Sequence, residues 1–549
     1  MRAGGGAPGL SIKKKLALKK GKNMKTRHFS DIEILETICQ SKLAKLKKLG
    51  PSLGRHLPSK RILPLVKPAV LEARSPGDKT PFVIAEIKRA SPTKGDIAAI
   101  DNPVSLASEY LKQGALAISI LCEEDYFKGR LEDLIAIKTA FPHSCILRKD
   151  FILTKEEIST SYLLGADMVL LIAAIFMRDL ENLKSIYEET RRLGLTALIE
   201  IHNEQEWNLI SSLDLNGAII GINSRNLKDF KLNQCAALKL KAHLPPHIPV
   251  IFESGIEIPH ECFIVGNSGF DGILCGSFLV SSIAMDSKNP KSSNSLVSLK
   301  DALAQGMATA SKTSGFYEGL LTRLASRRAL SPRRPLVKVC GINDLDFLRE
   351  ASAHADLLGF VLSDKSPRFV GEEFLTAAGG LLDSINDQGD FAIPPRIGVV
   401  TRDSLDLGLS MLRRGLLDAL QLHGITKAVD SNGLYFPGYV ALNLEDFLES
   451  KAKTLASYGV QMGGFVLWDS SHGSSKALNI QSVKKLEAYA WLSGNLWLAG
   501  GINLSNLDEV LALNPMLIDI CSGFESSRGK KDTYLLEEFF SKLCKLCKA

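Results

Sequence analysis

Several charged residues in the first half of the chain stand directly after short apolar runs. Glu86 and Lys88 end the run FVIAEIK, and Lys149 ends the run CILRK. Glu200 and Glu253 close TALIE and PVIFE in the same way. A buried apolar strand has no reason to end in charges unless that end opens into a functional site. The combination predicts a site in which cations hold an anionic substrate and carboxylates transfer protons.

The alternative for either lysine is a surface side chain whose ammonium reaches solvent. Against this, Glu86 and Lys88 are two residues apart in one strand, so both side chains point the same way. We therefore favour a shared site. We also expect desolvation and neighbouring charge to tune the pKa of Lys149 toward useful acidity.

One thiol and one carboxylate follow apolar runs in the second half. Cys340 ends LVKVC, and Asp469 ends FVLWD, the sixth such run of this half. A lone cysteine is usually a small buried hydrophobe. At a strand end with an acid opposite, a reactive thiolate is the other interpretation. Such a pair suits an aldose–ketose isomerisation, in which one group removes a carbon-bound proton and another protonates the ring oxygen.

Eight strand-like runs in each half of the chain would position these residues. The first series covers 82–88, 116–121, 144–149, 168–172, 195–201, 218–223, 248–253 and 271–275. The second series covers 336–340, 356–362, 396–400, 418–422, 439–443, 464–469, 495–499 and 516–520. Helix-length segments separate the runs, which predicts a parallel sheet, and eight units predict closure. The predicted fold is α/β, two (β/α)8 TIM barrels in tandem, with each site at the C-terminal strand ends.

An open doubly wound sheet is the alternative fold. It would gather its site at one crevice rather than around all the strand ends. In a barrel, the loops after strands seven and eight commonly bind phosphate through backbone N–H groups. Ser254 and Gly255 follow the seventh run of the first series, and Gly276 and Ser277 follow the eighth. These positions favour the barrel and a phosphorylated substrate.

The chain of 549 residues is too long for one hydrophobic core and predicts several domains. A helix is expected to begin at Ser30, which has capping-box spacing to Glu33. Because this helix precedes the first barrel strand, we expect it to cover one end of the barrel. The predicted domains are a basic disordered extension over 1–29, a first barrel over 30–285, a linker with some helix around 299–304 over 286–333, and a second barrel over 334–549. A transit peptide and a nucleic-acid arm are the alternatives for the extension.

Bulk composition is that of an ordinary globular protein, with 45% hydrophobic residues, 23% charged residues and a net charge of +7. The longest apolar stretch is too short to span a bilayer. Ten cysteines without framework spacing fit reduced thiols in a cytoplasmic enzyme. Cys544 and Cys547 have CxxC spacing, but zinc would need two further ligands. We assign them to the apolar face of a last helix and expect no metal.

Six motifs of the first half resemble the indole-3-glycerol-phosphate synthase family. They stand in order, one per expected strand end: AEIKRASPTKG, LRKDF, LIEIHN, GINSRNL, ESGI and GSFLV. The resemblance covers about residues 30–285. It implies ring closure of 1-(2-carboxyphenylamino)-1-deoxyribulose 5-phosphate, with loss of carbon dioxide and water.

The same resemblance implies roles for individual residues of the first half. Lys149 would be the general acid at the ketone, and Lys88 would engage the anthranilate carboxylate. Glu86 and Glu200 would handle protons during dehydration. The residues that would position the intermediate are Asn223, Arg225, Glu253 and Ser254, and those that would hold the phosphate are Ser91, Gly276 and Ser277.

Motifs of the second half resemble the phosphoribosylanthranilate isomerase family: LVKVCGIN, GFVLSDKSPRFV, LQLHG, LAGGIN and IDICSGFESSRGKKD. By this resemblance Cys340 would be the general base, Asp469 the general acid, and Arg368 the anchor of the anthranilate carboxylate. The segment 469–476 departs from the family's glycine-rich turn by having serines, which resist the φ > 0 that glycine permits. The remaining implied substrate-binding residues are His423, which would line the site, and a phosphate cradle of Gly500, Gly501, Ser522 and Gly523.

The two implied activities are consecutive, because the isomerase product is the synthase substrate. The sequence thus predicts a monomeric bifunctional enzyme of tryptophan biosynthesis. It would act on anionic sugar phosphates with no metal and no organic cofactor, and would bind neither nucleic acid nor membranes. One alternative keeps the synthase but gives the second barrel a weakened or related sugar-phosphate isomerase role. Another is a basic-tailed scaffold that binds nucleic acid through inactive barrels.

Overall fold

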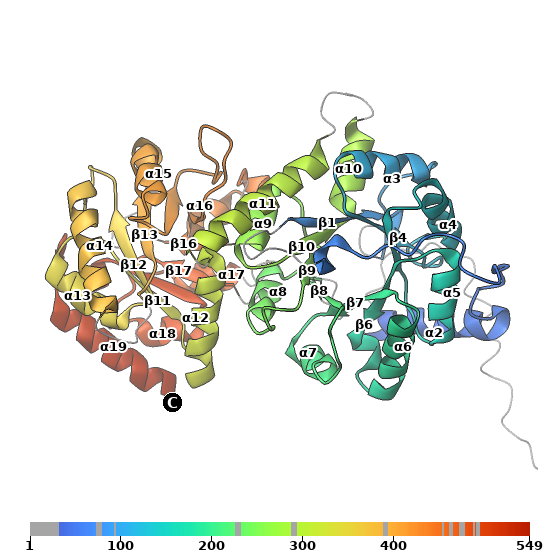
Figure 1. The fold of residues 1–549 in the computed structure, drawn as a ribbon. Helices are drawn as coiled ribbons and strands as arrows, with labels where there is room; N and C mark the ends of the chain where they lie inside the picture. Colours follow the sequence, from blue (N-terminus) through green and yellow to red (C-terminus); the bar gives the residue numbers. More distant parts are fainter. Residues whose placement is uncertain are drawn as a thin grey trace, which may run out of the picture.

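Two eight-stranded barrels lie side by side in this chain, shown in Figure 1 as a computed structural model. The predicted basic extension, residues 1–29, lies outside the described residues, and so do residues 471–477 of the loop that follows Asp469. The structure describes residues 32–72, 80–92, 95–225, 232–286, 294–313, 315–387, 393–452, 455–460, 465–470, 478–486, 489 and 495–548.

The first half forms a closed parallel barrel in which β1 pairs with both β4 and β10. Its strands are β1 (Phe82–Ile87), β4 (Ala117–Leu121), β5 (Cys145–Lys149), β6 (Met168–Ile172), β7 (Thr196–Ile201), β8 (Ile219–Asn223), β9 (Val250–Glu253) and β10 (Gly272–Cys275). The intervening helices are α3 (Pro103–Lys112), α4 (Leu131–Ala140), α5 (Glu156–Leu164), α6 (Leu180–Arg192), α7 (Glu204–Ile210), α8 (Gln234–Lys241), α9 (Pro259–Asn267) and α10 (Ser277–Asp286). The predicted barrel is confirmed, and the open sheet is excluded for this half.

The second half forms another closed parallel barrel, in which β11 pairs with β12 and β18. Its strands are β11 (Leu336–Cys340), β12 (Leu357–Val361), β13 (Arg396–Val400), β14 (Ala419–His423), β15 (Gly438–Asn443), β16 (Val466–Asp469), β17 (Trp497–Ala499) and β18 (Leu517–Ile520). Its helices are α13 (Leu345–His354), α14 (Glu372–Asn386), α15 (Leu405–Arg413), α16 (Leu444–Glu449), α17 (Ile480–Lys485), α18 (Leu507–Ala512) and α19 (Thr533–Lys548). The tandem arrangement is thereby confirmed as well.

Polar caps begin helices in both barrels. The side chain of Asn102 accepts a hydrogen bond from the Ser105 N–H at 3.0 Å at the start of α3. Asp344 does the same for the Phe347 N–H at 2.7 Å at the start of α13. Such caps satisfy backbone donors that the first helical turn leaves open. Each chain segment can therefore leave a strand end and become helical within a few residues.

The helix before the first barrel, α2 (Ile32–Leu49), is tied to the C-terminal strand ends. Lys42 Nζ lies 2.7 Å from Asp150 Oδ2, directly after β5. Lys45 Nζ lies 2.7 Å from Asp125 Oδ1, in the loop after β4. Because both partners follow strand ends, α2 covers one side of the barrel mouth, as expected for a helix that precedes the barrel.

A long helix, α11 (Ser295–Thr313), occupies much of the segment predicted as a linker. It crosses α9 at two glycines. A Cβ on Gly266 would lie 2.4 Å from the Leu303 carbonyl oxygen, and one on Gly306 would lie 2.1 Å from the Phe263 carbonyl oxygen. Only glycine permits two helix backbones to approach this closely. Since α9 belongs to the first barrel, α11 packs as part of that barrel. The helix is therefore longer than predicted, while the domain boundaries stay a prediction.

A second helix of this segment, α12 (Phe316–Leu330), joins the barrels. Tyr317 Oη donates to the Gly438 carbonyl at 2.6 Å and accepts from the Gly438 N–H at 3.1 Å, where β15 begins. The Tyr317 ring stacks on Phe465, just before β16, at 5.1 Å between centroids. The N-terminal pole of the second barrel thus packs on α12 (Figure 1). Its C-terminal strand ends lie at the opposite pole.

Across the part of the chain that the structure describes, every helix is too short or too polar to cross a membrane.

Candidate active sites

A cavity at the C-terminal strand ends of the first barrel gathers the residues predicted for the first site. Glu253 is not in the lining itself, but its carboxylate accepts a hydrogen bond at 2.5 Å from the Lys149 ammonium, which is. The other predicted residues all line the cavity: Glu86, Lys88, Ser91, Lys149, Glu200, Asn223, Arg225, Ser254, Gly276 and Ser277. Residues from strands as distant in sequence as β1 and β10 therefore meet at one mouth.

Lys149 is held among carboxylates. Its Nζ lies 2.5 Å from Glu253 Oε2 and 3.3 Å from Glu200 Oε2. Burial alone would lower the pKa of Lys149, but the charges of Glu253, Glu200 and Glu86 raise it above its ordinary value. The expectation of a more acidic Lys149 is therefore wrong. The residue is a stable ammonium, suited to stabilise negative charge that develops on a substrate oxygen.

The two carboxylates beside Lys149 differ in proton affinity. Burial raises the pKa of Glu253 to about 7. Burial acts on Glu200 in the same direction, but Lys149 and His202 outweigh it and lower the pKa of Glu200. One carboxylate is thus held as an anion, while the other can carry a proton near neutral pH. Environments that separate two pKa values in this way are typical of acid–base pairs.

Lys88 has different surroundings from Lys149. Its Nζ lies 3.6 Å from Glu86 Oε2 and 5.4 Å from the centroid of the Phe127 ring. Burial lowers the pKa of Lys88 against the attraction of Glu86, and the charges of Lys149 and Arg225 act in the same direction as burial. A bound carboxylate would restore the charge of this lysine. Lys88 is therefore the lysine better suited to hold an anionic substrate group.

His202, which was not predicted as a site residue, holds the Glu200 carboxylate in place. Its Nε2 lies 3.3 Å from Glu200 Oε1, and its Nδ1 lies 2.9 Å from Glu206 Oε2. Burial alone would lower the pKa of His202, but hydrogen bonds to the two carboxylates raise it to about 10. The imidazolium therefore orients the carboxylate that faces Lys149. Its place in the motif LIEIHN, two residues after Glu200, is the signal available in the sequence.

Backbone N–H groups gather after β9 and β10. Ser254 and Gly255 have φ of 67° and 81°, in the left-handed region. The helix α10 begins at Ser277, directly after β10, and its first-turn N–H groups have no helical acceptor. A Cβ on Gly276 would lie 2.5 Å from Glu86 Oε2, so any larger residue there would displace the Glu86 carboxylate. A helix N-terminus beside such a turn suits a phosphate group.

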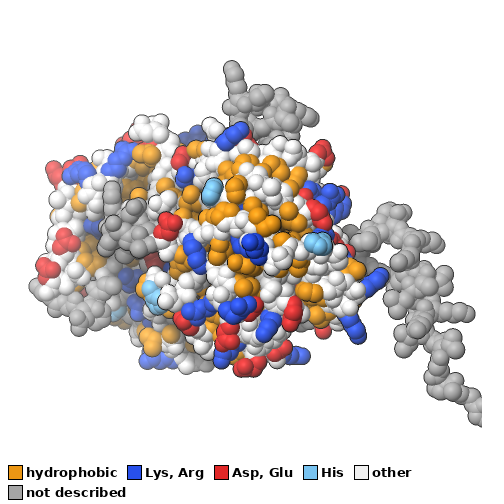
Figure 2. Space-filling view, turned by 45° about the vertical axis from the view of Figure 1, so that its right-hand side comes forward, with side chains coloured by type: hydrophobic (Ala, Val, Ile, Leu, Met, Phe, Trp, Pro, Cys, Tyr) orange, Lys and Arg blue, Asp and Glu red, His pale blue; other side chains and the backbone are white. Residues whose placement is uncertain are grey.

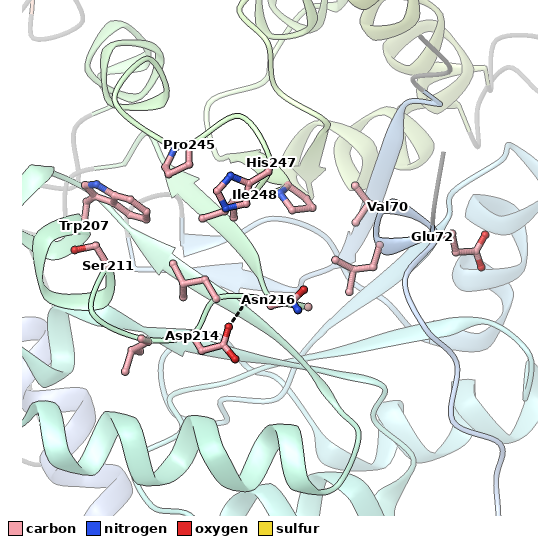
Figure 3. Close-up of a pocket in the computed structure, with 14 residues that line it drawn as sticks. Val70, Glu72, Trp207, Ser211, Asp214, Asn216, Pro245, His247 and Ile248 are labelled. Carbon is pink, nitrogen blue, oxygen red and sulfur yellow. Dashed lines mark hydrogen bonds between the residues drawn. The ribbon is translucent and has the colours of Figure 1, made fainter. Parts of the chain in front are cut away.

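The opposite pole of the first barrel holds a second cavity of about 800 Å³, shown in Figure 3. Its lining comes from α7, the turns before β8 and β9 and the segment 70–72, and includes Trp207, Asp214 and His247. The Asp214 carboxylate accepts from the Asn216 N–H at 3.2 Å, drawn as a dashed line in Figure 3, and pairs with Arg191 at 2.7 Å. The predicted residues of the first site lie at the other pole, as the barrel argument requires.

In the second barrel, Cys340 ends β11 next to a buried lysine. Lys338 Nζ lies 3.3 Å from Cys340 Sγ, 2.5 Å from Gln421 Oε1 and 2.8 Å from Asp519 Oδ2. Asp519 interacts electrostatically with both Cys340 and Asp469, which ends β16. Cys340 and Asp469 therefore lie at the same pole. Lys338 was not predicted, although its position two residues before Cys340 places it on the same strand face.

A second thiol, Cys521, lies close to Cys340, and each of the two side chains is the largest influence on the pKa of the other. This contact and burial raise the pKa of Cys340. The same contact, helped by the charges of Lys531 and Arg368, lowers the pKa of Cys521 to about 7. Near neutral pH the pair therefore holds one proton between two sulfur atoms. Cys521 was not predicted as a site residue.

Arg368 is bound by a carboxylate of the same chain. Its Nε lies 2.6 Å from Glu525 Oε1 and its Nη2 lies 2.8 Å from Glu525 Oε2, a two-pronged ion pair. Lys531 Nζ lies 3.2 Å from the same carboxylate. A Cβ on Gly341 would meet Arg368 Cδ at 2.7 Å, so the arginine lies beside the residue that follows Cys340. A substrate carboxylate would have to share Arg368 with Glu525 or replace it.

The predicted phosphate cradle follows β17 and β18. Gly500 and Gly501 have φ of 98° and 62°, and the side-chain amides of Asn503 and Asn506 donate to the Gly501 carbonyl at 3.1 and 3.0 Å. These amides hold the turn in its left-handed shape. Ser522 and Gly523 stand in a single turn of 3-10 helix after β18, η7 (Ser522–Phe524). The four residues thus follow neighbouring strands, where backbone N–H groups can converge.

His423 ends β14 and is partly exposed. Its Nε2 lies 2.8 Å from Gln421 Nε2. Gln421 also meets Lys338, which connects His423 to the groups beneath Cys340. The altered loop after Asp469 falls outside the described residues from position 471 to 477.

The CxxC pair lies on α19, where Cys547 is partly buried against the apolar core and Cys544 is exposed. The apolar-face prediction therefore holds for Cys547 alone. Among the described residues, no group of three or more His, Cys, Asp or Glu side chains could hold a metal ion.

On the face shown in Figure 2, Lys and Arg side chains are interspersed with Asp and Glu. A nucleic-acid-binding surface usually gathers basic side chains on one face. The visible face of the chain has mixed charge instead.

Two family models match the chain in tandem. The model of indole-3-glycerol phosphate synthase matches residues 35–290, and that of N-(5'phosphoribosyl)anthranilate (PRA) isomerase matches residues 337–542.

Individual relatives agree with these matches. An indole-3-glycerol phosphate synthase of Streptomyces griseus is 42% identical over 198 residues, which are 36% of this chain and 72% of the relative. A multifunctional tryptophan biosynthesis protein of Schizosaccharomyces pombe is 27% identical over 495 residues, and the match covers 84% of this chain and 59% of the relative. The phosphoribosyl anthranilate isomerase structure from Thermus thermophilus is 30% identical, with 38% of this chain and 99% of that chain covered and a TM-score of 0.32.

Proposed function

The chain belongs to the indole-3-glycerol phosphate synthase family through its first barrel and carries an N-(5′-phosphoribosyl)anthranilate isomerase domain in its second, and we propose that the residues at the two mouths catalyse consecutive steps of tryptophan biosynthesis. The second barrel isomerises N-(5-phosphoribosyl)anthranilate to 1-(2-carboxyphenylamino)-1-deoxyribulose 5-phosphate. The first barrel closes that product to indole-3-glycerol phosphate, with loss of carbon dioxide and water. The observation that carries the assignment of residues is that each mouth holds, at the C-terminal strand ends, the acid, base and anion-binding groups that its step needs.

In the isomerase step, Asp469 protonates the ribose ring oxygen, and the carbon–oxygen bond of the ring opens. Cys340 then removes the proton from C2′, and the carbonyl group forms at that carbon. Arg368 holds the anthranilate carboxylate in competition with Glu525, to which it is bound at 2.6 Å. The turns after β17 and β18 hold the phosphate, with Gly500, Gly501, Ser522 and Gly523 as their contacts.

In the synthase step, the Lys149 ammonium polarises the C2′ ketone, so that the electron-rich anthranilate ring can attack it. Lys88 holds the carboxylate that leaves as carbon dioxide, a role that its lowered pKa supports because the anion restores its charge. Glu86 and Glu200 move protons during the loss of water, and Glu253, with a pKa of about 7, is a third group able to do so.

The remaining predicted residues of the first mouth bind the substrate. Asn223, Arg225 and Ser254 line the cavity beside the catalytic lysines and position the intermediate. Ser91, Gly276 and Ser277 line it as well and hold the phosphate. Support for this comes from the start of α10 at Ser277, because the N-terminus of a helix attracts an anion through its dipole.

The activity is tested with purified full-length protein supplied with N-(5-phosphoribosyl)anthranilate, with formation of indole-3-glycerol phosphate followed over time. We expect complete conversion that excess chelator leaves unchanged, since the proposed steps use side chains alone. Formation of no product, or loss of turnover on chelation, contradicts the proposal.

A weakened or related isomerase activity in the second barrel is the competing proposal, favoured by the serines that replace glycines in segment 469–476. Complementation of an isomerase-deficient auxotroph decides between them. Growth at the rate given by an established isomerase supports the full activity. Failure to grow, with synthase activity intact, supports the competitor.

We further propose a monomer in a reducing compartment. All ten cysteines are free thiols, as expected where disulfides are kept reduced. Sedimentation velocity at a mass near 59.8 kDa tests the monomer; a species of twice that mass contradicts it.

A further inference from the structure

Cys340 ends β11, and Cys521 directly follows β18, the adjacent parallel strand. β11 pairs with β18 in a register that matches Lys338 with Asp519 and Val339 with Ile520. Cys340 and Cys521 are the next residues on each side. Side chains alternate along a strand, and Lys338 and Asp519 meet inside the barrel at 2.8 Å. Cys340 therefore points to that same interior side, at the mouth, and Cys521, which directly follows β18, acts on it there.

This placement fits the geometry of a disulfide. Adjacent strands lie about 4.8 Å apart, and the Cα atoms of bonded cysteines are usually about 4.4 to 6.8 Å apart. The register places the two residues side by side, and each side chain is the largest influence on the pKa of the other. A Cβ on Gly341 would lie 2.9 Å from Cys521 Sγ, and Gly341 has φ of 71°. The glycine after Cys340 therefore leaves the space that Cys521 occupies.

The charges around Cys521 favour a reactive thiolate. Lys531 Nζ lies 3.9 Å from Cys521 Sγ and donates to the Cys521 carbonyl at 2.8 Å. Arg368 acts on the same thiol, and Glu525 partly offsets the two cations. The contact with Cys340 lowers the pKa of Cys521 to about 7. Cys521 is partly exposed at the mouth, whereas Cys340 is 5% exposed, so Cys521 is the sulfur that a small oxidant reaches first.

We propose that Cys340 and Cys521 form a redox modification site, in which a hydroperoxide converts the two thiols to a disulfide and switches off the isomerase but not the synthase. This inference rests on the proposed role of Cys340 as the isomerase base. A disulfide removes that base, and it leaves the first mouth, on the other barrel, unchanged.

The chemistry balances with hydrogen peroxide as the oxidant. The Cys521 thiolate attacks one peroxide oxygen, the O–O bond breaks, hydroxide leaves, and Cys521 becomes a sulfenic acid. The Cys340 sulfur then attacks the sulfenic sulfur, an S–S bond forms, and the departing hydroxide takes the Cys340 proton as water. Two electrons pass from the two thiols to the peroxide. A dithiol reductant reverses the reaction by thiol–disulfide exchange.

Other cysteines lack this combination. Burial raises the pKa of Cys122, Cys145 and Cys275, which disfavours their thiolates. Cys544 is exposed, which makes it the control for simple accessibility. The site is therefore distinguished by a paired, charge-stabilised thiol rather than by exposure.

The test treats full-length protein with hydrogen peroxide and measures both activities, followed by blocking of free thiols and peptide mapping. We expect a cross-link between the peptides that contain Cys340 and Cys521. Isomerase turnover should fall by ~10²-fold or more, the contribution expected of a general base, while synthase turnover is unchanged. Dithiothreitol should restore the isomerase.

Two variants sharpen the test, each compared with its own activity before treatment. Cys521→Ser should form no cross-link, and its peroxide-treated isomerase should not recover with dithiothreitol, because Cys340 alone oxidises beyond the sulfenic acid. Cys544→Ser should behave as wild type. Reversible inactivation that persists in Cys521→Ser, or cross-links that join other cysteines instead, would overturn the proposal. A cross-link between Cys340 and Cys521 with full isomerase turnover would overturn both the switch and the assignment of Cys340 as the base, while leaving the synthase assignment intact.

Discussion

The two barrel mouths have opposite electrostatic arrangements on the same fold. In the first, an ammonium lies among carboxylates: Lys149 contacts Glu253 at 2.5 Å and Glu200 at 3.3 Å, and its pKa is raised. In the second, a pair of thiols lies among cations: Lys338 contacts Cys340 Sγ at 3.3 Å, and Lys531 lies 3.9 Å from Cys521 Sγ.

The difference shows which part of the chemistry the fold provides. Both barrels bring the ends of parallel strands to one pole, and both carry glycine-rich turns after their last two strands. The side chains at the strand ends then decide whether the mouth holds a cation that donates hydrogen bonds or a sulfur that accepts a proton. The barrel fold determines where the site lies, and the charges at the strand ends determine the direction of proton transfer.

The largest effect should come from removing the cation of the first mouth. In Lys149→Ala, Glu200 and Glu253 lose their shared partner and the ketone loses the ammonium that polarises it. We expect synthase kcat to fall by ~10⁴-fold, the upper range for an acid–base group, with isomerase turnover unchanged. Steady-state assays of each step measure this. Lys155→Ala, an exposed lysine at the start of α5, is the matched control. Near-normal synthase turnover in Lys149→Ala would contradict the role of this ammonium in the first mouth.

A somewhat smaller loss should follow removal of the thiol in the second mouth. Cys340→Ala should lower isomerase kcat by ~10³-fold, less than the first variant because Cys521 stays beside the vacated position. Synthase turnover on its own substrate should be unaffected. Cys544→Ala, at an exposed cysteine, should match wild type. Retention of most isomerase activity in Cys340→Ala would mean that the thiols are structural.

A change of pH should separate the two mouths. Because the pKa of Cys521 is lowered to about 7, the thiol pair gains a second proton below that pH, and isomerase kcat/KM should decline as pH falls through about 7. Lys531→Met removes a cation that favours the thiolate, so the midpoint of this decline in kcat/KM should move up by ~1 pH unit. Lys530→Met, at the neighbouring exposed lysine, should leave it in place. If the midpoint does not move in Lys531→Met, the cations do not set the charge of the two thiols.

The smallest effect should come from the helix between the barrels. Tyr317→Phe leaves the Gly438 N–H and carbonyl without the partners they have at 3.1 and 2.6 Å. We expect the free energy of unfolding of the second barrel to fall by ~1–3 kcal/mol, the cost of unpaired buried polar groups. Both kcat values should be unchanged, since Gly438 lies at the pole opposite the mouth. Thermal unfolding measures the loss, with Tyr534→Phe, 70% exposed, as the control.

Sequence alone located all sixteen barrel strands, because each is a short apolar run bounded by turns and helix-length segments. It also placed the charged residues at the correct pole, since parallel strands have only one C-terminal face. The segment with α11 and α12 was interpreted as mainly irregular because it is rich in Ser and Lys. Both helices are held by tertiary contacts that composition does not reveal: α11 by the close approach at Gly266 and Gly306, and α12 by the hydrogen bonds between Tyr317 and Gly438.

The parts of the sites that sequence missed depend on pairings between distant residues. Cys340 and Cys521 are adjacent only through the register of β11 and β18. The pKa of Lys149 rises rather than falls because β9 brings Glu253 to its ammonium. Glu525 binds Arg368 from 157 positions away in sequence. Strand order could be predicted, but the side-chain partners across the mouth depend on how distant segments pack in the folded chain.

The central claim is that two separate mouths perform two consecutive reactions, and mixing single variants tests it most directly. Given N-(5-phosphoribosyl)anthranilate, Cys340→Ala should leave the starting compound unused, and Lys149→Ala should accumulate the deoxyribulose phosphate. A mixture of the two proteins should restore indole-3-glycerol phosphate, because the intermediate made by one chain can be closed by the other. The account would be contradicted if the mixture made no product although each variant kept the activity of its unmutated barrel. It would also be contradicted if either variant alone formed product at the wild-type rate.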